Sequence, residues 1–355
     1  MTTINWRPRE LPTHGQMTLP RKYFISPEVL EEEFQRLFTR QWLCVDREER
    51  IAGRGDFFLY EFAGESIIIL RDQGGTVRAF YNVCRHRGSK LCEEHQGQLS
   101  ETIQCPYHAW TYGLDGRLIG APATHDLEGF RKQDWPLHAV PVATWEGFIF
   151  INLSPDPVPF EESHAPLLDR FRRFNIAGLK VGKTIEYDVK ANWKLVVQNY
   201  SECYHCPLVH PTLTKRTPPT LGENDLVDGP FLGGYMILAN EAKSMTMSGR
   251  VCGLPVDPAL PVEDHDRVYY YSIMPNMLLS LHPDYVMYHV LWPVAPDRTR
   301  PVERRQGGLM SAEGGGWLPP GMAVAHPAAP RRQNPARHRG MAARRPSLDV
   351  GQVSR

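Results

Sequence analysis

Apolar residues change their spacing along the chain. Over residues 27–43 they recur every three or four positions, which predicts an amphipathic helix with Ser26 as N-cap and Pro27 in its first position. The face of this helix consists of Leu30, Phe34, Leu37, Phe38 and Gln41. From about residue 45 to 155 apolar residues fall in short runs separated by turn signals such as Gly74-Gly75, which predicts a small β domain. The strand-like runs are residues 57–60, 66–70, 77–81 and 148–153.

The second half of the chain mixes both periods. A proline-rich stretch at residues 154–159 predicts a linker between the halves. Beyond it, two segments have helical spacing and three have strand spacing, which predicts an α+β arrangement of helices on an antiparallel sheet. The helical segments are residues 163–174 and 191–205, and the strands are residues 267–274, 277–282 and 285–292. His282-Pro283-Asp284 is the expected hairpin turn between the last two strands.

Composition is that of an ordinary globular protein and excludes several classes. Of 355 residues, 42 % are hydrophobic and 23 % charged, and the formal net charge is zero. No run of eighteen apolar residues predicts a membrane span, and no basic patch in the body predicts nucleic-acid binding. The N-terminus lacks the pattern of a signal peptide. Seven cysteines, an odd number, favour a reducing cytoplasm in which those outside metal sites are free thiols.

Two mixed Cys-His pairs carry the clearest chemistry. Cys84 and His86 form a C-x-H pair, and Cys105 and His108 form a C-x2-H pair, with strand-like runs on both sides. Two thiolates on one iron and two imidazoles on the other are the ligand set of a Rieske [2Fe–2S] cluster, whose potential lies above that of a four-cysteine cluster. Structural zinc is the alternative, but zinc sites usually pair two residues of one type in each half. The spacing favours one-electron transfer.

A second candidate site follows about a hundred residues later in the sequence. Asn199, Glu202 and His205 recur every three residues, so a helix would place them on one face. Pro207 would end that helix, and His210 would then fold back beside His205. Two imidazoles and a carboxylate form the facial triad of non-haem Fe(II) oxygenases. The simpler interpretation is an ordinary helix that carries two structural histidines.

Both motifs, with their flanking residues 82–88, 105–110 and 199–210, resemble the α subunit of Rieske non-haem iron ring-hydroxylating oxygenases over residues 20–300. The resemblance implies a small all-β Rieske domain followed by a helix-grip catalytic domain. It implies that Cys84, His86, Cys105 and His108 hold the cluster and that His205 and His210 bind mononuclear Fe(II). Glu202 matches the carboxylate that links the iron to a cluster histidine of a neighbouring subunit, and family members are commonly homotrimers. The interpretation of Glu202 as a solvated helix residue is the alternative.

The expected domains follow from this resemblance. Residues 1–44 form an N-terminal segment that packs with the catalytic domain, residues 45–155 the Rieske domain and residues 156–300 a truncated catalytic domain. Residues 301–355 are a tail rich in Arg, Pro, Ala and Gly, with nine arginines and three acidic residues. Trp110 and Tyr107 are expected to pack over the cluster and keep water away.

The tail departs from the family pattern. The third iron ligand of the family is an aspartate on the order of a hundred residues or more beyond the second histidine. That position falls in residues 301–355, where no periodic apolar pattern remains. We interpret the tail as translated out of frame. A genuinely disordered tail is the alternative, with the carboxylate supplied by Asp349, Glu313, Asp225 or Asp228.

The predicted function is that of a terminal oxygenase component. A separate flavin- or ferredoxin-type reductase would supply electrons from NAD(P)H, because the chain has no dinucleotide-binding fingerprint. O2 would then hydroxylate or demethylate a small organic molecule. Residues 199–207 look nearest to the branch that acts on glycine betaine, choline and carnitine, and aromatic side chains could surround a trimethylammonium group. These are Tyr269, Tyr270, Tyr271, Tyr285, Tyr288 and Trp292. The alternatives are an aromatic-ring dioxygenase α subunit and a protein that only transfers electrons.

Overall fold

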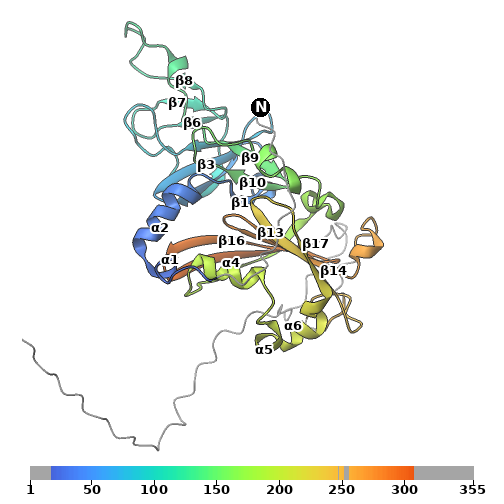
Figure 1. Cartoon of the computed structure of the whole chain (residues 1–355). Coiled ribbons are helices and arrows are strands. Elements are labelled where there is room, and N and C mark those ends of the chain that lie inside the picture. Colours follow the sequence, from blue (N-terminus) through green and yellow to red (C-terminus); the bar gives the residue numbers. More distant parts are fainter. Residues whose placement is uncertain (1–16, 247, 252–255, 308–355) are drawn as a thin grey trace, which may run out of the picture.

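The computed structural model describes residues 17–246, 248–251 and 256–307, the last six by their backbone. Its N-terminal half consists of three small antiparallel sheets (Figure 1), with strand orders β1-β10-β9, β4-β3-β2-β5 and β6-β7-β8. These strands are β1 Leu43–Arg47, β2 Asp56–Phe62, β3 Glu65–Arg71, β4 Val77–Tyr81, β5 Gln96–Gln98, β6 Thr102–Gln104, β7 Thr111–Gly113, β8 Leu118–Gly120, β9 Val142–Trp145 and β10 Phe148–Ile151. The predicted β domain is confirmed. Three of the four strand-like runs lie within these strands, and the fourth, residues 148–153, extends two residues past the end of β10.

The N-terminal helix is shorter than predicted. Helix α2 (Pro27–Glu33) has Ser26 as its N-cap, whose side chain accepts from the Val29 N–H, as the sequence indicated. It continues as the π-helical turn η1 (Phe34–Phe38) and ends there, not at residue 43. The prediction was wrong beyond Phe38 because Leu43 is completely buried in β1, so pairing with β10 prevails over helical spacing. A short helix α1 (Lys22–Ile25), which was not predicted, comes before α2.

A seven-stranded antiparallel sheet forms the C-terminal half, in the order β11-β17-β16-β15-β14-β13-β12. Its strands are β11 Lys180–Glu186, β12 Gly222–Asp225, β13 Phe231–Ile237, β14 Arg267–Ile273, β15 Met277–Leu281, β16 Val286–Ala295 and β17 Arg298–Gly307. The three predicted strands correspond to β14, β15 and β16, and the hairpin turn closes with His282 N–H donating to Tyr285 O at 2.9 Å. Strand β17 continues the sheet to Gly307, seven residues past the expected end of the domain. The rest of the predicted tail, residues 308–355, lies outside the described residues.

Successive side chains of this sheet divide between two cores. From β14, Tyr269 and Tyr271 enter a large aromatic cluster with Phe148 and Phe171 of the preceding segments. Tyr288 of β16 lies in the same cluster. The opposite face receives helix α4 (Trp193–Ser201), which contacts β14 and β16. Three of the six aromatic residues proposed to surround a substrate therefore belong to a closed core on the face away from α4.

The helices of the C-terminal half are also shorter than their pattern suggested. Residues 163–174 were predicted as one helix, but the chain forms α3 (Phe160–Ser163) and separate 3-10 turns at η4 (Ala165–Leu167) and η5 (Arg172–Phe174). Pro166 lies inside η4, where its missing N–H is tolerated in a first turn but not in a helix interior. Helix α4 ends at Ser201, and α5 (Cys206–Val209) and α6 (Pro211–Arg216) follow it. The remaining 3-10 turns are η2 Glu48–Ile51, η3 Lys132–Asp134, η6 Ile176–Gly178, η7 Pro219–Leu221 and η8 Val262–Asp264.

The N-terminal segment contacts α4 directly. Glu33 accepts from Trp193 Nε1 at 2.8 Å and pairs with Lys194 Nζ at 2.6 Å. Phe38 packs edge-on against the Trp193 ring at 5.1 Å between centroids. These contacts fix the first turn of the helix that leads to the predicted iron ligands.

A buried arginine joins the two halves. Arg47 at the end of β1 is 2 % exposed, and its guanidinium donates to the carbonyls of Ile176 at 3.0 Å and Leu179 at 3.1 Å, just before β11. It also donates to Glu146 O at 2.9 Å. A Cβ at Gly147 would come within 2.9 Å of this guanidinium, and the residue has φ +76°, so only glycine suits the turn. In the part of the chain that the structure describes, no helix has the length and apolar character to cross a membrane.

Burial of His164 predicts acid sensitivity. Its ring is 1 % exposed and stacks on Phe160 at 4.3 Å, and burial lowers its pKa to about 4. The unfolded chain takes up this proton near pH 6.5, so the free energy of unfolding should fall as the pH drops from 6.5 to 4, by up to about 3 kcal/mol. His164→Phe keeps the stacked ring and should flatten that part of the profile in denaturant titrations followed by circular dichroism. If His164→Phe loses as much free energy of unfolding between pH 7 and pH 4.5 as the wild type does, the assignment to His164 is wrong.

Candidate metal centres

The two Cys-His loops have the same backbone construction. In the first loop, Gly88 N–H donates to Cys84 O at 3.0 Å, and Cys84 N–H donates to Ser89 O at 2.8 Å. In the second, Ala109 N–H donates to Cys105 O at 3.1 Å, and Cys105 N–H donates to Trp110 O at 2.8 Å. The fifth residue of each loop is left-handed, with φ +74° at Gly88 and +56° at Ala109. Two matched loops thus present two matched donor pairs.

Burial separates the sulfur donors from the nitrogen donors. Cys84 is 2 % exposed and Cys105 is 3 % exposed, both in the hydrophobic cluster that also contains Ile68 and Leu70 of β3. His86 and His108 are exposed, with ring centroids 4.8 Å apart. An iron held by the thiolates would therefore be buried, and an iron held by the imidazoles would lie at the surface, where an electron can enter or leave.

Electrostatics differ between the two cysteines. Burial raises the pKa of Cys84, and nearby Cys105 raises it further. At Cys105 burial acts in the same direction, but hydrogen bonds from the backbone N–H groups of Tyr107 and His108 lower its pKa overall. Slight desolvation, then the charges of His108 and Arg87, lower the pKa of His86 and favour the neutral imidazole that binds metal. The donor set therefore fits a [2Fe–2S] cluster with two protein ligands on each iron.

Neighbouring side chains complete the cluster site. The Tyr112 hydroxyl lies 3.4 Å from Cys84 Sγ and accepts from the Arg85 N–H at 3.1 Å. Trp110 is buried and stacks on His86 at 4.9 Å, which confirms the expected packing of Trp110. The expectation for Tyr107 was wrong, because its ring contacts His108 but is 62 % exposed and excludes little water. Tyr112 was not predicted to belong to this site. The available signal was its position in β7, the strand that follows the second loop.

Loss of the Tyr112 hydroxyl should lower the potential of the cluster. A hydrogen bond to a ligand sulfur stabilises the more negative, reduced state. If this hydrogen bond stabilises the reduced state by about 1 kcal/mol more than the oxidised state, Tyr112→Phe should lower the midpoint potential by roughly 40 mV. Voltammetry measures this change. Tyr107→Phe is the matched control and should leave the potential unchanged. Equal potentials for wild type and Tyr112→Phe would show that the hydroxyl has no such role.

The second candidate site is a turn, not a helix face. Helix α4 ends at Ser201, and Glu202 is extended with φ −137° and ψ 157°, so the predicted helical face of Asn199, Glu202 and His205 is wrong. The turn nevertheless brings Glu202 Oε1 to 2.5 Å from His205 Nδ1. The rings of His205 and His210 lie 5.2 Å apart, at the two ends of α5. The predicted proximity of the two histidines is therefore present, with a different local cause.

Hydrogen bonds define the state of this turn. Burial acts to raise the pKa of Glu202, but hydrogen bonds from His205 and from the Tyr204 N–H outweigh it, so the pKa is lowered. A carboxylate that accepts from Nδ1 leaves Nε2 of His205 as the nitrogen available to a metal. Desolvation and then the charge of His205 lower the pKa of His210, which favours its neutral, metal-binding form. Two imidazoles with open positions suit Fe(II).

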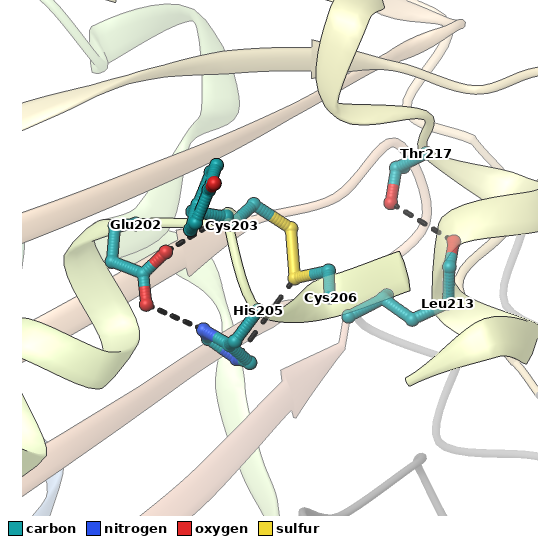
Figure 2. The surroundings of a disulfide bond; sticks show 7 residues. Glu202, Cys203, His205, Cys206, Leu213 and Thr217 are labelled. Carbon is teal, nitrogen blue, oxygen red and sulfur yellow. Dashed lines mark hydrogen bonds and ion pairs between the residues drawn. A yellow bond between two sulfur atoms is a disulfide. The ribbon is translucent and has the colours of Figure 1, made fainter. Parts of the chain in front are cut away.

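Figure 2 shows a disulfide inside this turn. Cys203 and Cys206 are joined across the residues that include His205, and Cys206 Sγ lies 4.0 Å from His205 Nε2. Our expectation that all cysteines outside metal sites are free thiols was therefore wrong for this pair. The C-x2-C spacing was the available signal, and the extended residue Glu202 opens the loop that lets the two sulfurs meet.

The proposed substitutes for the third iron ligand are not at this turn. Asp225 pairs with Arg170 and accepts from the Tyr271 hydroxyl, on the opposite side of the sheet from α4. Asp228 is exposed in the loop after β12. Within the described residues, no three His, Cys, Asp or Glu side chains converge on one metal position. Asp349 and Glu313 lie outside the described residues.

Cysteine labelling tests the disulfide directly. Denatured, unreduced protein treated with iodoacetamide should give a peptide over residues 203–206 with both cysteines unmodified and the mass of a bridged pair. After reduction the same peptide should carry two labels. Cys44 and Cys92 are the internal controls, and each should be labelled both with and without reduction. Full labelling of Cys203 without reductant, in protein kept free of thiols during purification, would rule out the bridge.

The fold and the two sites define a class: an iron protein in which an electron-transfer domain precedes a separate iron-binding domain. Comparison with known proteins agrees. Residues 41–131 match the model of the Rieske [2Fe-2S] domain, and residues 176–304 match that of the ring hydroxylating alpha subunit (catalytic domain). The chain therefore contains a Rieske [2Fe–2S] domain followed by a ring-hydroxylating alpha subunit catalytic domain, which implies a [2Fe–2S] cluster and a mononuclear iron.

Several characterised proteins are similar to this chain. The carnitine monooxygenase oxygenase subunit of Acinetobacter baumannii is 36 % identical over 196 residues, which cover 55 % of this chain and 53 % of that protein. The glycine betaine monooxygenase oxygenase subunit of Chromohalobacter salexigens is 36 % identical over 217 residues, or 61 % and 47 %. The chain thus spans about half the length of these relatives. The crystal structure of the quaternary ammonium Rieske monooxygenase CntA with gamma-butyrobetaine matches with a TM-score of 0.66 and 26 % identity, over 83 % of this chain and 76 % of that one.

Proposed function

We propose that this chain is the terminal oxygenase component of a multicomponent monooxygenase. The observation that carries the proposal is the pairing of two sites in one chain. One is a buried-thiolate, exposed-imidazole cluster set, and the other is a turn in which Glu202 holds His205 beside His210. When bound, the cluster supplies single electrons and the mononuclear iron supplies O2 activation. A separate flavin- or ferredoxin-type reductase would deliver electrons from NAD(P)H, and the proposed location is the cytoplasm.

Each protein group at the two sites has a defined task. Cys84 and Cys105 hold the buried side of the cluster, and His86 and His108 hold the exposed side. His205 and His210 hold the mononuclear iron through neutral imidazole nitrogens. Glu202 orients His205 by accepting from Nδ1, and it is 47 % exposed, so it can accept a further N–H from outside the chain.

The positions of the two sites favour electron transfer between copies of the chain. In Figure 1 the cluster hairpins β6–β8 lie at one end of the molecule and α5 at the other. Large side chains are exposed beside each site: Tyr204 at 97 % and Leu208 at 92 % near the turn, and Tyr107 at 62 % at the cluster. Exposed apolar side chains of this kind are typical of interaction surfaces. A homotrimer in which each cluster meets the neighbour's Glu202 satisfies both observations.

A quaternary amine is the proposed substrate class. The supporting observation is the similarity to carnitine and glycine betaine monooxygenase oxygenase subunits and to CntA, which its structure describes as a quaternary ammonium monooxygenase. The corresponding reaction is hydroxylation of an N-methyl group by O2 and two electrons from the reductase, after which the C–N bond of the N-hydroxymethyl product breaks and formaldehyde and a proton leave. The solved aromatic-ring dioxygenases, such as the naphthalene dioxygenase of Rhodococcus, share the fold at 24 % identity and give no support for an aromatic substrate.

Iron content and turnover test the function together. Anaerobically purified protein should contain about three irons per chain, with the Rieske signal in the EPR spectrum of the reduced sample, if both sites are filled. With a reductase, it should consume O2 in response to glycine betaine or carnitine. Glu202→Gln should keep the cluster signal and lower turnover by about 10- to 100-fold, because it weakens the orientation of His205. Glu161→Gln, an exposed glutamate on α3, is the control.

The competing function is electron transfer alone. About two irons per chain with an intact Rieske signal, and no amine-dependent O2 consumption, would support it and reject the oxygenase proposal. That result would also agree with an out-of-frame tail that lacks the third iron ligand. A colourless, zinc-loaded protein would reject both.

A further inference from the structure

Asp284 is a buried carboxylate in the hairpin between β15 and β16. It is 5 % exposed, and its Oδ1 has no hydrogen-bond partner among the residues that the structure describes. The Ser244 hydroxyl and a backbone N–H are the groups that hydrogen-bond to the carboxyl. Burial outweighs these bonds and raises the pKa of Asp284 to about 6, so the group is still an anion at neutral pH.

The other buried aspartates of the described chain show what is missing at Asp284. Asp46 pairs with Arg50 at 2.7 Å, Asp72 pairs with Arg78 at 2.7 Å, and Asp264 pairs with Arg173. Within the described residues, no cationic side chain is among the groups that act on the carboxyl of Asp284. A buried charge without a partner is unfavourable unless something else neutralises it. Among the described residues, three of the four buried aspartates therefore have a cationic partner, and Asp284 has none.

Aromatic residues flank Asp284 in the sequence of the hairpin. His282 stacks on Tyr285 with ring centroids 4.1 Å apart and an angle of 11°, on either side of Asp284 in the sequence. Tyr270 of β14 lies 6.3 Å from the His282 ring. An anion beside aromatic faces suits a cation with a diffuse charge and no hydrogen-bond donors, which is the chemistry of a trimethylammonium group.

The hairpin lies on the same side of the sheet as the iron turn. The ring centroids of Tyr270 and Tyr200 lie 6.0 Å apart. Tyr200 belongs to α4 and comes two residues before Glu202 in the sequence. Leu213 of α6, three residues after His210, packs with Tyr270 on a small cluster that contains Met245, the neighbour of Ser244. Contacts thus lead from both ends of the turn that carries His205 and His210 to the surroundings of Asp284.

We propose that Asp284 is the specificity-determining anion that binds the quaternary ammonium group of the substrate, with Tyr270, His282 and Tyr285 around it. This inference rests on the proposed function and adds to it a named recognition residue. A cationic substrate would provide the missing countercharge, whereas a neutral molecule of the same shape would leave the carboxylate unpaired. Asp284 would therefore make the site select a cationic substrate over a neutral molecule of the same shape.

Isothermal titration of the anaerobic full-length protein with two matched ligand pairs tests the proposal. Choline is compared with 3,3-dimethylbutan-1-ol and glycine betaine with 3,3-dimethylbutanoate, because each pair differs only by nitrogen for carbon at the quaternary centre. For at least one pair the wild type should bind the ammonium compound at least about tenfold more tightly. Asp284→Asn should abolish that preference without weakening binding of the carbon analogue. Asp266→Asn, an exposed aspartate paired with Lys243, should behave as wild type.

The outcomes separate this proposal from the wider one. If Asp284→Asn keeps the preference for the ammonium compounds, or the wild type has no preference, Asp284 is not the recognition residue. The iron count and amine-dependent O2 consumption described above do not depend on that result, so the oxygenase function can stand when this inference falls. The comparison of ligand pairs in the wild type needs no variant, so a wild type without any preference rejects the proposal even if Asp284→Asn does not fold.

Discussion

The alternation of side chains in β14, β15 and β16 is the constraint on which the catalytic half depends. Every second residue enters the aromatic core behind the sheet, and that core is closed by tyrosines, phenylalanines and leucines. The residues between them face α4 and include Ser272, Ser280 and Tyr270. Because a strand cannot slip by one residue without exchanging its faces, the apolar core fixes which polar groups lie beneath the iron turn.

The cluster loops follow a similar logic at a smaller scale. Each loop is closed by the same two backbone hydrogen bonds, and each ends in a left-handed residue that turns the chain back. Its cysteine is anchored in the hydrophobic core below β3, while the histidine remains outside. Packing of the two cysteines into this core therefore decides which iron would be buried.

The sequence predicted which residues are candidate metal ligands more accurately than it predicted the helices and turns that carry them. The Cys-His spacing and the strand runs were sufficient for the cluster domain, because ligand identity and period-two patterning are local properties. Helical period was a poorer guide, because it extended the first helix past Phe38 and α4 past Ser201, where the chain leaves the helical conformation. The Cys203–Cys206 bridge had a local signal in the C-x2-C spacing, but it forms in a turn that the helical period did not predict. The surroundings of Asp284 could not be predicted, since they depend on how distant segments meet. The roles of Glu202, His205 and His210 remain predictions that the chemistry of the turn supports.

Arg47 has a consequence for how electrons can travel. Its guanidinium is held by carbonyls of the segment that enters the second sheet, and it packs over Phe148 at 4.9 Å. Opening that junction would expose several carbonyls and leave a cation without acceptors in an apolar surrounding. The two halves are thus locked as one body, without a hinge at this point. The separation of the cluster loops from the His205 turn therefore does not depend on a hinge at Arg47.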